Sequence, residues 1–201
     1  MIKCTENYRL KKMAKDALGT KILDIGCAEM PNVYIKNKEL IGLDLLSAKL
    51  PENYAAAVLG NAYDLPEPFS AHSFDTVFAG EVIEHVSDPV RFLKRIYMTL
   101  KPGGRIILST PNPLSPPEML CNVFLNRKIL YCNDHITLYP QRWLVRVLEM
   151  SGFEDVKLKS GGIQAPFVGT GKFPRMGLVP FPRAFCYQTI ALARASECKQ
   201  E

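Results

Sequence analysis

Short apolar runs alternate along this chain with segments in which apolar residues recur at helical spacing. Short, nearly continuous apolar runs are typical of strands that are buried on both faces of a sheet. The pattern predicts seven strands, at residues 21–25, 39–45, 56–60, 73–79, 105–110, 153–160 and 186–195.

Three segments carry the apolar stripe of an amphipathic helix, and they cover residues 6–18, 89–100 and 140–152. Asp88 followed by Pro89 is typical of a helix start, and Gly19 follows the last apolar residue of the first helix. Buried strands separated by helices predict an α/β fold, doubly wound, with a mostly parallel sheet covered on both faces.

The length of 201 residues favours one domain over residues 1–201 with a core of its own. Residues 161–185 are rich in Gly, Pro, Phe and basic residues and show no clear periodicity. A segment of this kind inside a compact domain is typical of a long loop or lid, here before the last strand.

Composition narrows the possible classes of protein. The net charge of +5 is a mild excess that we take to be spread over the surface, so it gives little support to a nucleic-acid partner. The six cysteines form no CxxC pair, which disfavours a metal–thiolate site or a disulfide framework. Neither a secretory leader nor an apolar stretch of about 18 residues is present, and we expect a cytoplasmic protein.

Polar residues follow four of the predicted strands at the point where each strand ends. In a parallel α/β sheet these carboxyl ends form the ligand-binding edge. The residues at this edge are Asp24, Gly26, Cys27 and Ala28, then Asp44 and Leu45, then Asn61, Ala62 and Asp64, and finally Glu81, Glu84 and His85. An acid placed like Asp44 can accept hydrogen bonds from ribose hydroxyls.

Five segments in this order resemble the class I S-adenosylmethionine-dependent methyltransferases: "LDIGC", "GLDLL", "GNAYDLP", "SFDTVFAGEVIEHVSDP" and "LKPGGRIILSTPNP". The resemblance covers roughly residues 8–160 and implies a Rossmann-like, seven-stranded sheet whose last strand is antiparallel. It implies S-adenosylmethionine as cofactor, with Asp44 on the ribose, the Asn61–Ala62 edge on the adenine, and Asp24 and Gly26 beside the methionine moiety. Cys27, Ala28, Leu45 and Glu81 complete the predicted cofactor site.

The turn after the first strand departs from the family pattern. The family has Asp-x-Gly-x-Gly-x-Gly, whereas Ala28 and Met30 stand in place of the last two glycines. An alanine forced to positive φ costs about 1 kcal/mol, which is small against the roughly 8 kcal/mol of a micromolar affinity. We therefore expect a working cofactor site with an irregular turn. A degenerate, non-catalytic partner module remains the alternative.

Glu81, Glu84 and His85 share one face of a helical turn by their i, i+3, i+4 spacing, and His135 lies in a segment that folds over the substrate end in the resembling enzymes. The four residues could hold Mg²⁺ or Mn²⁺, as in the ubiquinone-pathway O-methyltransferases and the small-RNA 2′-O-methyltransferases that they resemble. Alternatively, the acid and the histidine could simply hydrogen-bond each other, with no metal bound. With or without metal, His85 is the first candidate base and His135 the second, because a neutral imidazole suits deprotonation of a hydroxyl.

The acceptor follows from weaker signals. "STPNP" is not the Asn-Pro-Pro-aromatic signature of amino-group methylation, so methyl transfer to an oxygen of a small hydroxylated acceptor is favoured. Metal-assisted RNA 2′-O-methylation is the alternative. Residues 161–185 mix Phe, Lys and Arg, and could cover the substrate, touch a membrane surface, hold RNA by stacking or pack on the sheet.

Overall fold

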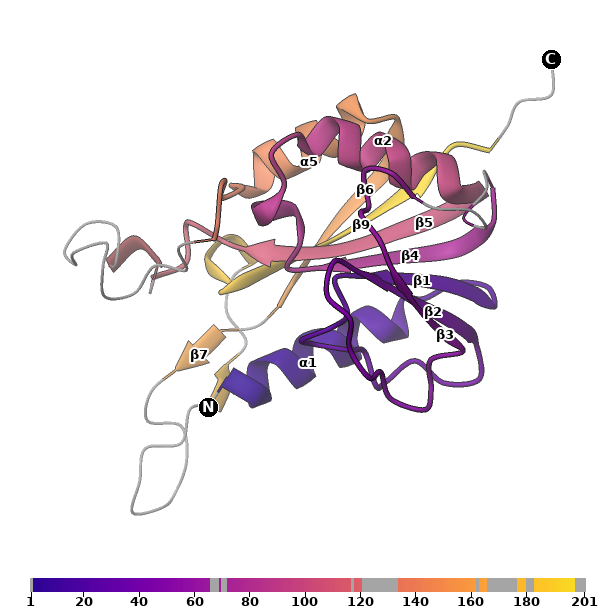
Figure 1. Ribbon diagram of the computed structural model, residues 1–201. Helices are drawn as coiled ribbons and strands as arrows, with labels where there is room; N and C mark the ends of the chain where they lie inside the picture. Colours follow the sequence, from indigo (N-terminus) through magenta and orange to yellow (C-terminus); the bar gives the residue numbers. More distant parts are fainter. Residues whose placement is uncertain are drawn as a thin grey trace.

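The computed structural model describes residues 2–65, 69, 72–116, 118–120, 134–161, 163–165, 177–179 and 183–197. Seven strands form one sheet in the order β3-β2-β1-β4-β5-β9-β6 (Figure 1). Their bounds are β1 Lys21–Ile25, β2 Glu39–Asp44, β3 Ala56–Leu59, β4 Phe74–Gly80, β5 Leu100–Pro111, β6 Phe153–Ser160 and β9 Gln188–Ala195. Strand β9 pairs antiparallel with both neighbours, while β1 to β5 pair in parallel. The predicted fold is confirmed.

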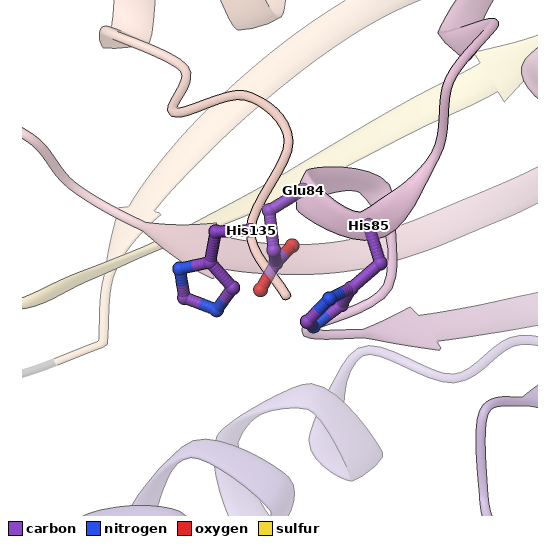
Figure 2. Close-up of side chains that lie close together, drawn as sticks. All are labelled: Glu84, His85 and His135. Carbon is purple, nitrogen blue, oxygen red and sulfur yellow. The ribbon is translucent and has the colours of Figure 1, made fainter. Parts of the chain in front are cut away.

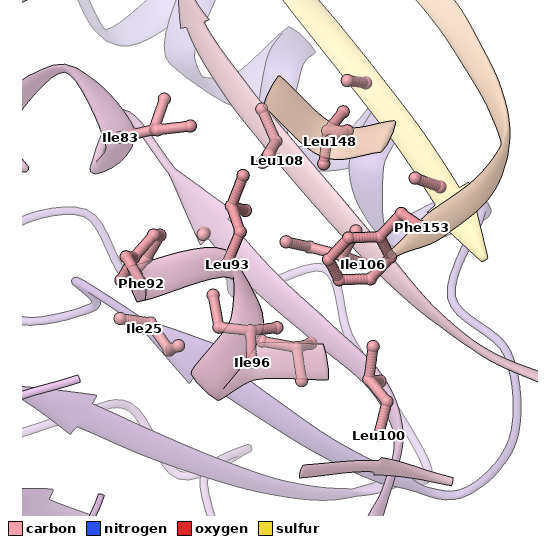
Figure 3. Packing of buried hydrophobic residues seen from close by; sticks show 14 of the residues in the cluster. Ile25, Ile83, Phe92, Leu93, Ile96, Leu100, Ile106, Leu108, Leu148 and Phe153 are labelled. Atoms are coloured by element: carbon pink, nitrogen blue, oxygen red, sulfur yellow. The ribbon is translucent and has the colours of Figure 1, made fainter. Parts of the chain in front are cut away.

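Helices cover both faces of this sheet (Figure 1). Helix α1, Ile2–Lys15, lies on one face, and helices α2, Pro89–Thr99, and α5, Gln141–Met150, lie on the other. Helix α2 begins as predicted, because the Asp88 carboxylate accepts a hydrogen bond from the Arg91 N–H and Pro89 occupies the first position. Its buried stripe of Phe92, Leu93 and Ile96 packs with β4, β5 and α5 to form the larger core (Figure 3). A smaller core lies under α1 around Met13 and Phe78.

The two crossovers on the α1 face contain no helix, although strands separated by helices were expected. Residues 26–38, between β1 and β2, and residues 45–55, between β2 and β3, contain only turns and bends. Pro31 and Pro51 interrupt the two segments, and the Asn32 side-chain oxygen accepts from the Tyr34 N–H in a local turn that competes with a helix.

The remaining described elements are short. A 3-10 turn, η1 at Ile83–His85, follows β4, and a second one, η2 at Arg183–Phe185, precedes β9. Strands β7, Ile163–Ala165, and β8, Gly177–Val179, pair antiparallel within the predicted 161–185 loop. Residues 162, 166–176 and 180–182 lie outside the described part, so the lid and its membrane or substrate contacts stay predictions. Among the described helices, none has both the length and the apolar character needed to cross a bilayer.

Candidate functional site

The parallel register brings the predicted cofactor residues to one edge of the sheet. Ile25 pairs with Leu43 and with Ala79, and Asp44 pairs with Leu59, so the turns after β1, β2, β3 and β4 leave the sheet side by side. Ligands bind at this carboxyl edge in open α/β sheets. The predicted cofactor residues therefore lie along one edge of the sheet, and ligand binding there stays a prediction.

Gly26 opens the first turn and needs to be glycine. Its φ is +75°, and a Cβ built there would lie 2.5 Å from a methyl group of Val82. Its N–H donates to the Leu43 carbonyl at 2.9 Å, which fixes the turn against β2. Ala28 and Met30, by contrast, are not among the residues with positive φ. The strain expected at Ala28 is therefore absent, because the turn leaves the glycine-rich path of the family after Gly26.

Asp44 anchors the same turn. Its Oδ2 accepts from the Ala28 N–H at 2.8 Å and its Oδ1 accepts from the Leu46 N–H at 2.9 Å. Each carboxylate oxygen keeps a further lone pair for a ligand hydroxyl. Around it, Leu45 and Leu59 are 69% and 64% exposed, which places apolar surface beside an acceptor. A hollow of about 100 Å³ lies here, smaller than the roughly 300 Å³ of a typical ligand site.

The turn after β3 is held by its own side chain. The Asn61 Oδ1 accepts from the Tyr63 N–H at 2.9 Å, and the Asn61 carbonyl accepts from the Asp64 N–H at 3.0 Å. Asn61 is exposed and Ala62 packs partly on the core. Both lie at the predicted edge.

Asp24 lies beneath the first turn rather than open to a ligand. It is 6% exposed, and Oδ2 accepts from the Tyr54 hydroxyl at 2.5 Å. Burial raises the pKa of this carboxyl to about 6, against the opposing effect of the Tyr54 hydrogen bond. The neighbouring Cys27 is buried and free, and burial raises the pKa of its thiol to about 12, so the thiol is neutral.

Tyr54 was missed by the sequence reasoning. Its hydroxyl donates to Asp24 and accepts from the Asn32 N–H at 2.7 Å, which joins β1 to the irregular crossover. Asn53, its neighbour, donates to the carbonyls of Asn32 and Ile35 at 3.0 and 3.1 Å. These two side chains fix the segment after β1, which would be a helix in a regular crossover. In the sequence, the only signal of this role is that the two polar residues stand next to each other in a loop.

Glu81 follows β4 with φ at +57°, an uncommon conformation for a residue with a side chain. Its Oε1 accepts from the Ser109 hydroxyl at 2.8 Å, and Ser109 in turn accepts from Nη1 of Arg9 at 2.8 Å. Burial raises the pKa of Glu81, opposed first by the positive charge of Arg9. Strained residues cluster at functional sites, and here the strain lies at the predicted cofactor edge.

Arg9 is the second residue that sequence reasoning missed. It comes from α1, is 1% exposed, and forms an ion pair with Glu6. Its guanidinium lies against Gly80, where a Cβ would come 2.5 Å from Nη1. An arginine on the apolar stripe of a helix is the signal that could have revealed it, because a fully buried charge needs partners.

Glu84 is fully buried on η1. Its Oε2 accepts from the Thr110 hydroxyl at 3.1 Å, whereas Oε1 has no hydrogen-bond partner in the part of the chain that is described. Burial, and next the nearby Glu81, raise the pKa of Glu84 to about 8. Its backbone carbonyl accepts from the N–H groups of Ile136 and Thr137 at 2.7 and 3.2 Å, which ties the His135 segment to η1.

Glu84, His85 and His135 lie together (Figure 2). One ligand atom of each falls within 4.8 Å of the others, and the two imidazole rings meet edge to face with centroids 4.9 Å apart. Nδ1 of His85 lies 2.9 Å from the Asp134 carbonyl. A carbonyl only accepts, so Nδ1 carries the proton and Nε2 of a neutral His85 keeps its lone pair. Burial, and next His85, lower the pKa of His135.

Three of the four predicted metal ligands are therefore adjacent, and Glu81 is not one of this group. The i, i+3, i+4 spacing assumed a regular helical turn. Instead, the left-handed φ of Glu81 separates it from the 3-10 turn that carries Glu84 and His85, and Ser109 holds its carboxylate.

Comparisons with known proteins agree with this geometry. A family model described as a methyltransferase domain matches residues 7–158. A probable S-adenosylmethionine-dependent methyltransferase of Mycolicibacterium smegmatis is 30% identical over 155 residues, which are 72% of this chain and 56% of that protein. The mitochondrial ubiquinone biosynthesis O-methyltransferase of Mus musculus is 32% identical over 178 residues, covering 77% of this chain and 46% of that protein.

Solved structures share the fold. A Thermotoga maritima S-adenosylmethionine-dependent methyltransferase, titled a possible histamine N-methyltransferase, has a TM-score of 0.67 at 18% identity, covering 94% of this chain and 88% of that chain. The chain spans about half the length of the curated relatives it matches.

Proposed function

The chain belongs to the class I S-adenosylmethionine-dependent methyltransferases, and from this membership we propose that it methylates a hydroxyl oxygen of a small acceptor. The observation that carries the proposal is the pair His85 and His135 beside the cofactor edge, with Nε2 of a neutral His85 free to accept a proton. The name of the mouse relative, an O-methyltransferase, supports an oxygen acceptor.

The residues present fit the cofactor. Gly26 leaves space where a side chain would collide with Val82, and Asp44 offers carboxylate lone pairs between exposed apolar side chains. We assign the cofactor to these residues together with Ala28, Leu45, Asn61, Ala62 and Glu81, while Asp24 and Cys27, predicted beside the cofactor, are buried and would support the turn from beneath. When bound, S-adenosylmethionine supplies the electrophilic methyl group and its leaving group.

The protein contributes alignment and proton transfer. His85 takes the proton of the acceptor hydroxyl at Nε2 while Nδ1 is held by the Asp134 carbonyl. His135 is the second candidate base, since its lowered pKa keeps the ring neutral. Glu81 and Asp44, on either side of the first turn, orient the cofactor that they would bind.

We further propose that a divalent cation, Mg²⁺ or Mn²⁺, is bound by Glu84, His85 and His135. The unpartnered Oε1 of Glu84 supports this, because a buried carboxylate oxygen without a donor is costly unless a ligand satisfies it. Because Nδ1 of His85 donates to the Asp134 carbonyl, Nε2 holds the ring's one free lone pair, so His85 would be either a metal ligand or the base, not both at once. In the metal-bound form, the cation would act as a Lewis acid that acidifies the acceptor hydroxyl.

Two alternatives have support of their own. The same Glu84, His85 and His135 group suits metal-assisted methylation of an RNA 2′-hydroxyl. A non-catalytic partner module is favoured by the missing glycines, although the absence of positive φ at Ala28 and Met30 weakens that argument. A cytoplasmic location remains our proposal and is supported by the free thiols of Cys27 and Cys186.

The test is a methyl-transfer assay with radiolabelled S-adenosylmethionine and a panel of catechols and other small hydroxylated acceptors, with and without Mn²⁺. We expect His85→Gln to lower the rate at least a hundredfold while the cofactor Kd changes less than threefold, consistent with the usual contribution of a general base. His72→Gln is the matched control and should leave the rate unchanged. Unchanged turnover in His85→Gln would refute the assigned base.

Transfer in EDTA as fast as in Mn²⁺ would refute the metal. Cofactor binding without transfer to any hydroxyl acceptor would favour the partner module.

A further inference from the structure

Seven of the 25 Lys and Arg residues line one pair of hollows, a local concentration that differs from the even spread expected from composition. Two adjoining hollows of about 460 and 360 Å³ share Asp16 and Lys159 as lining residues. Together they form a groove between α1 and the strands β6, β9 and β5, which we call the basic groove. Its cations are Lys11, Lys12, Lys15, Arg105, Lys157, Lys159 and Arg194, and its acids are Asp16 and Asp155.

Cations outnumber acids more strongly in the groove than in the chain as a whole. The chain has 25 Lys and Arg against 20 Asp and Glu. Without the seven cations and two acids of the basic groove, 18 of each sign remain. The formal charge of the groove residues, +5, equals the net charge of the whole chain.

Most of these cations lack an acidic partner. Lys159 pairs with Asp16 at 2.6 Å, and Arg194 pairs with Glu197. Lys12 donates to the Ser160 carbonyl at 2.5 Å and Arg105 to the Asp16 carbonyl at 3.1 Å, and both of these acceptors are uncharged. Lys11, Lys15 and Lys157 are exposed and have no ion-pair partner among the residues that the structure describes.

Helix stability explains only part of this arrangement. Lys12 and Lys15 lie in the last turn of α1, where positive charge favours the helix dipole. Lys11 and Lys15, however, form a like-charge pair at i, i+4, which opposes the helix. The helix dipole also does not explain the positions of Lys157 and Lys159. These lysines are two residues apart on β6, so both lie on the face of the sheet that α1 covers. Three strands and one helix thus contribute cations to the same groove.

We propose that the basic groove binds the phosphodiester backbone of a single nucleic-acid strand. A row of unpaired cations in a concave surface suits a flexible chain of phosphates. Tyr8, 39% exposed at the end of the groove and contacted by Lys12 at 5.4 Å from its ring centroid, offers a face on which a base can stack. The strongly exposed leucines Leu45, Leu46 and Leu59 lie outside the groove, which disfavours a membrane surface as the partner.

The groove also leads toward the proposed active site. Its Tyr8 end is one residue from Arg9, whose guanidinium contacts Ser109, and Ser109 donates to Glu81 at the cofactor edge. A strand bound along α1 and β6 would therefore extend toward the carboxyl ends of the strands. The binding itself does not depend on the cofactor or on methyl transfer.

The experiment measures fluorescence anisotropy of a labelled single-stranded RNA of about 20 nucleotides with the full chain, at about 50 and 200 mM salt. We compare the wild type with the triple variant Lys11→Glu, Lys15→Glu, Lys157→Glu. The matched control carries the same charge change at exposed lysines outside the groove: Lys36→Glu, Lys49→Glu, Lys94→Glu. Circular dichroism establishes that all three proteins are folded.

We expect the groove variant to weaken RNA binding at least tenfold and the control less than threefold. The slope of log Kd against log salt should fall by about 2 in the groove variant, because each lost phosphate contact removes roughly 0.7. Equal weakening by both triple variants, or no RNA binding at about 50 mM salt, would overturn the proposal. Binding to phosphatidylserine-containing vesicles without RNA binding would also overturn it and identify a membrane partner instead.

Discussion

The turn after β1 and the segment after β4 meet at the same edge of the sheet, yet they are held in opposite ways. The first is an irregular crossover joined to β1 by one side chain, because the Tyr54 hydroxyl bridges Asp24 and the Asn32 backbone. The second is held by buried charge, with Arg9 and Ser109 on Glu81. We infer that the turn after β1 depends on loop anchoring and the segment after β4 on electrostatics.

The largest expected effect tests the charged side. Arg9→Met leaves the partly buried Glu81 and Glu6 without their cation, so the free energy of unfolding should fall by about 2–4 kcal/mol. Chemical denaturation measures it. Lys11→Met, exposed on the same helix, is the matched control and should change stability by less than about 0.5 kcal/mol. A loss below about 1 kcal/mol in Arg9→Met would show that the buried network does not hold this side.

The next effect is a pH dependence of stability in the turn after β1. Burial raises the pKa of Asp24 from its ordinary value of 3.8 to about 6, so between these pH values the folded protein binds a proton that the unfolded chain releases. Its contribution is therefore present below pH 3.8 and is lost as pH rises through about 6, which should lower stability by about 2–3 kcal/mol.

Asp24→Asn removes that titration. Unfolding free energies from pH 4 to 7 should therefore fall more steeply in the wild type than in the variant. Parallel pH profiles for the two proteins would contradict the assignment of a buried, proton-binding carboxyl.

A smaller effect tests the anchor itself. Tyr54→Phe removes the hydroxyl between Asp24 and Asn32, and should cost about 1–2 kcal/mol of stability and weaken S-adenosylmethionine binding about tenfold. The rate at saturating cofactor should stay unchanged, because the loop holds the cofactor rather than the acceptor. Tyr34→Phe alters a tyrosine of the anchored segment, residues 26–38, and serves as the control. Its stability and cofactor Kd should match those of the wild type. An unchanged Kd in Tyr54→Phe would remove the anchoring role.

The smallest effect concerns the missing glycine. Ala28 is not at positive φ, so Ala28→Gly relieves no strain and should change the cofactor Kd less than twofold. Gly26→Ala is the informative contrast, because it combines a φ of +75° with a contact of 2.5 Å to Val82 and should destabilise the fold by at least about 1 kcal/mol. A tenfold gain in affinity in Ala28→Gly would instead show that the lost glycine had weakened the site.

The residues explain how far the sequence could predict this molecule. Apolar runs located the strands because burial on both faces requires continuous apolar sequence, and Asp88–Pro89 located α2 because both residues act locally. The irregular crossover was foreseeable only as an interruption at Pro31 and Asn32. Its anchor was not, because Tyr54 lies 22 residues from Asn32 and 30 from Asp24.

Side-chain grouping by spacing was only partly successful. His135 was correctly placed near His85 on the strength of the family resemblance, whereas the spacing rule put Glu81 with them and was wrong because of its backbone conformation. The basic groove was missed for a similar reason. Its cations come from positions as far apart as 11 and 194, and composition alone cannot show that they converge.

The central claim is that this edge is a working cofactor site in spite of its altered turn. Calorimetric titration of the wild type with S-adenosylmethionine and S-adenosylhomocysteine tests it most directly, alongside Asp44→Ala and the exposed-acid control Glu52→Ala. We predict a micromolar Kd, at least a hundredfold weaker in Asp44→Ala and unchanged in Glu52→Ala. A folded wild-type protein that binds neither ligand up to millimolar concentration would contradict the account.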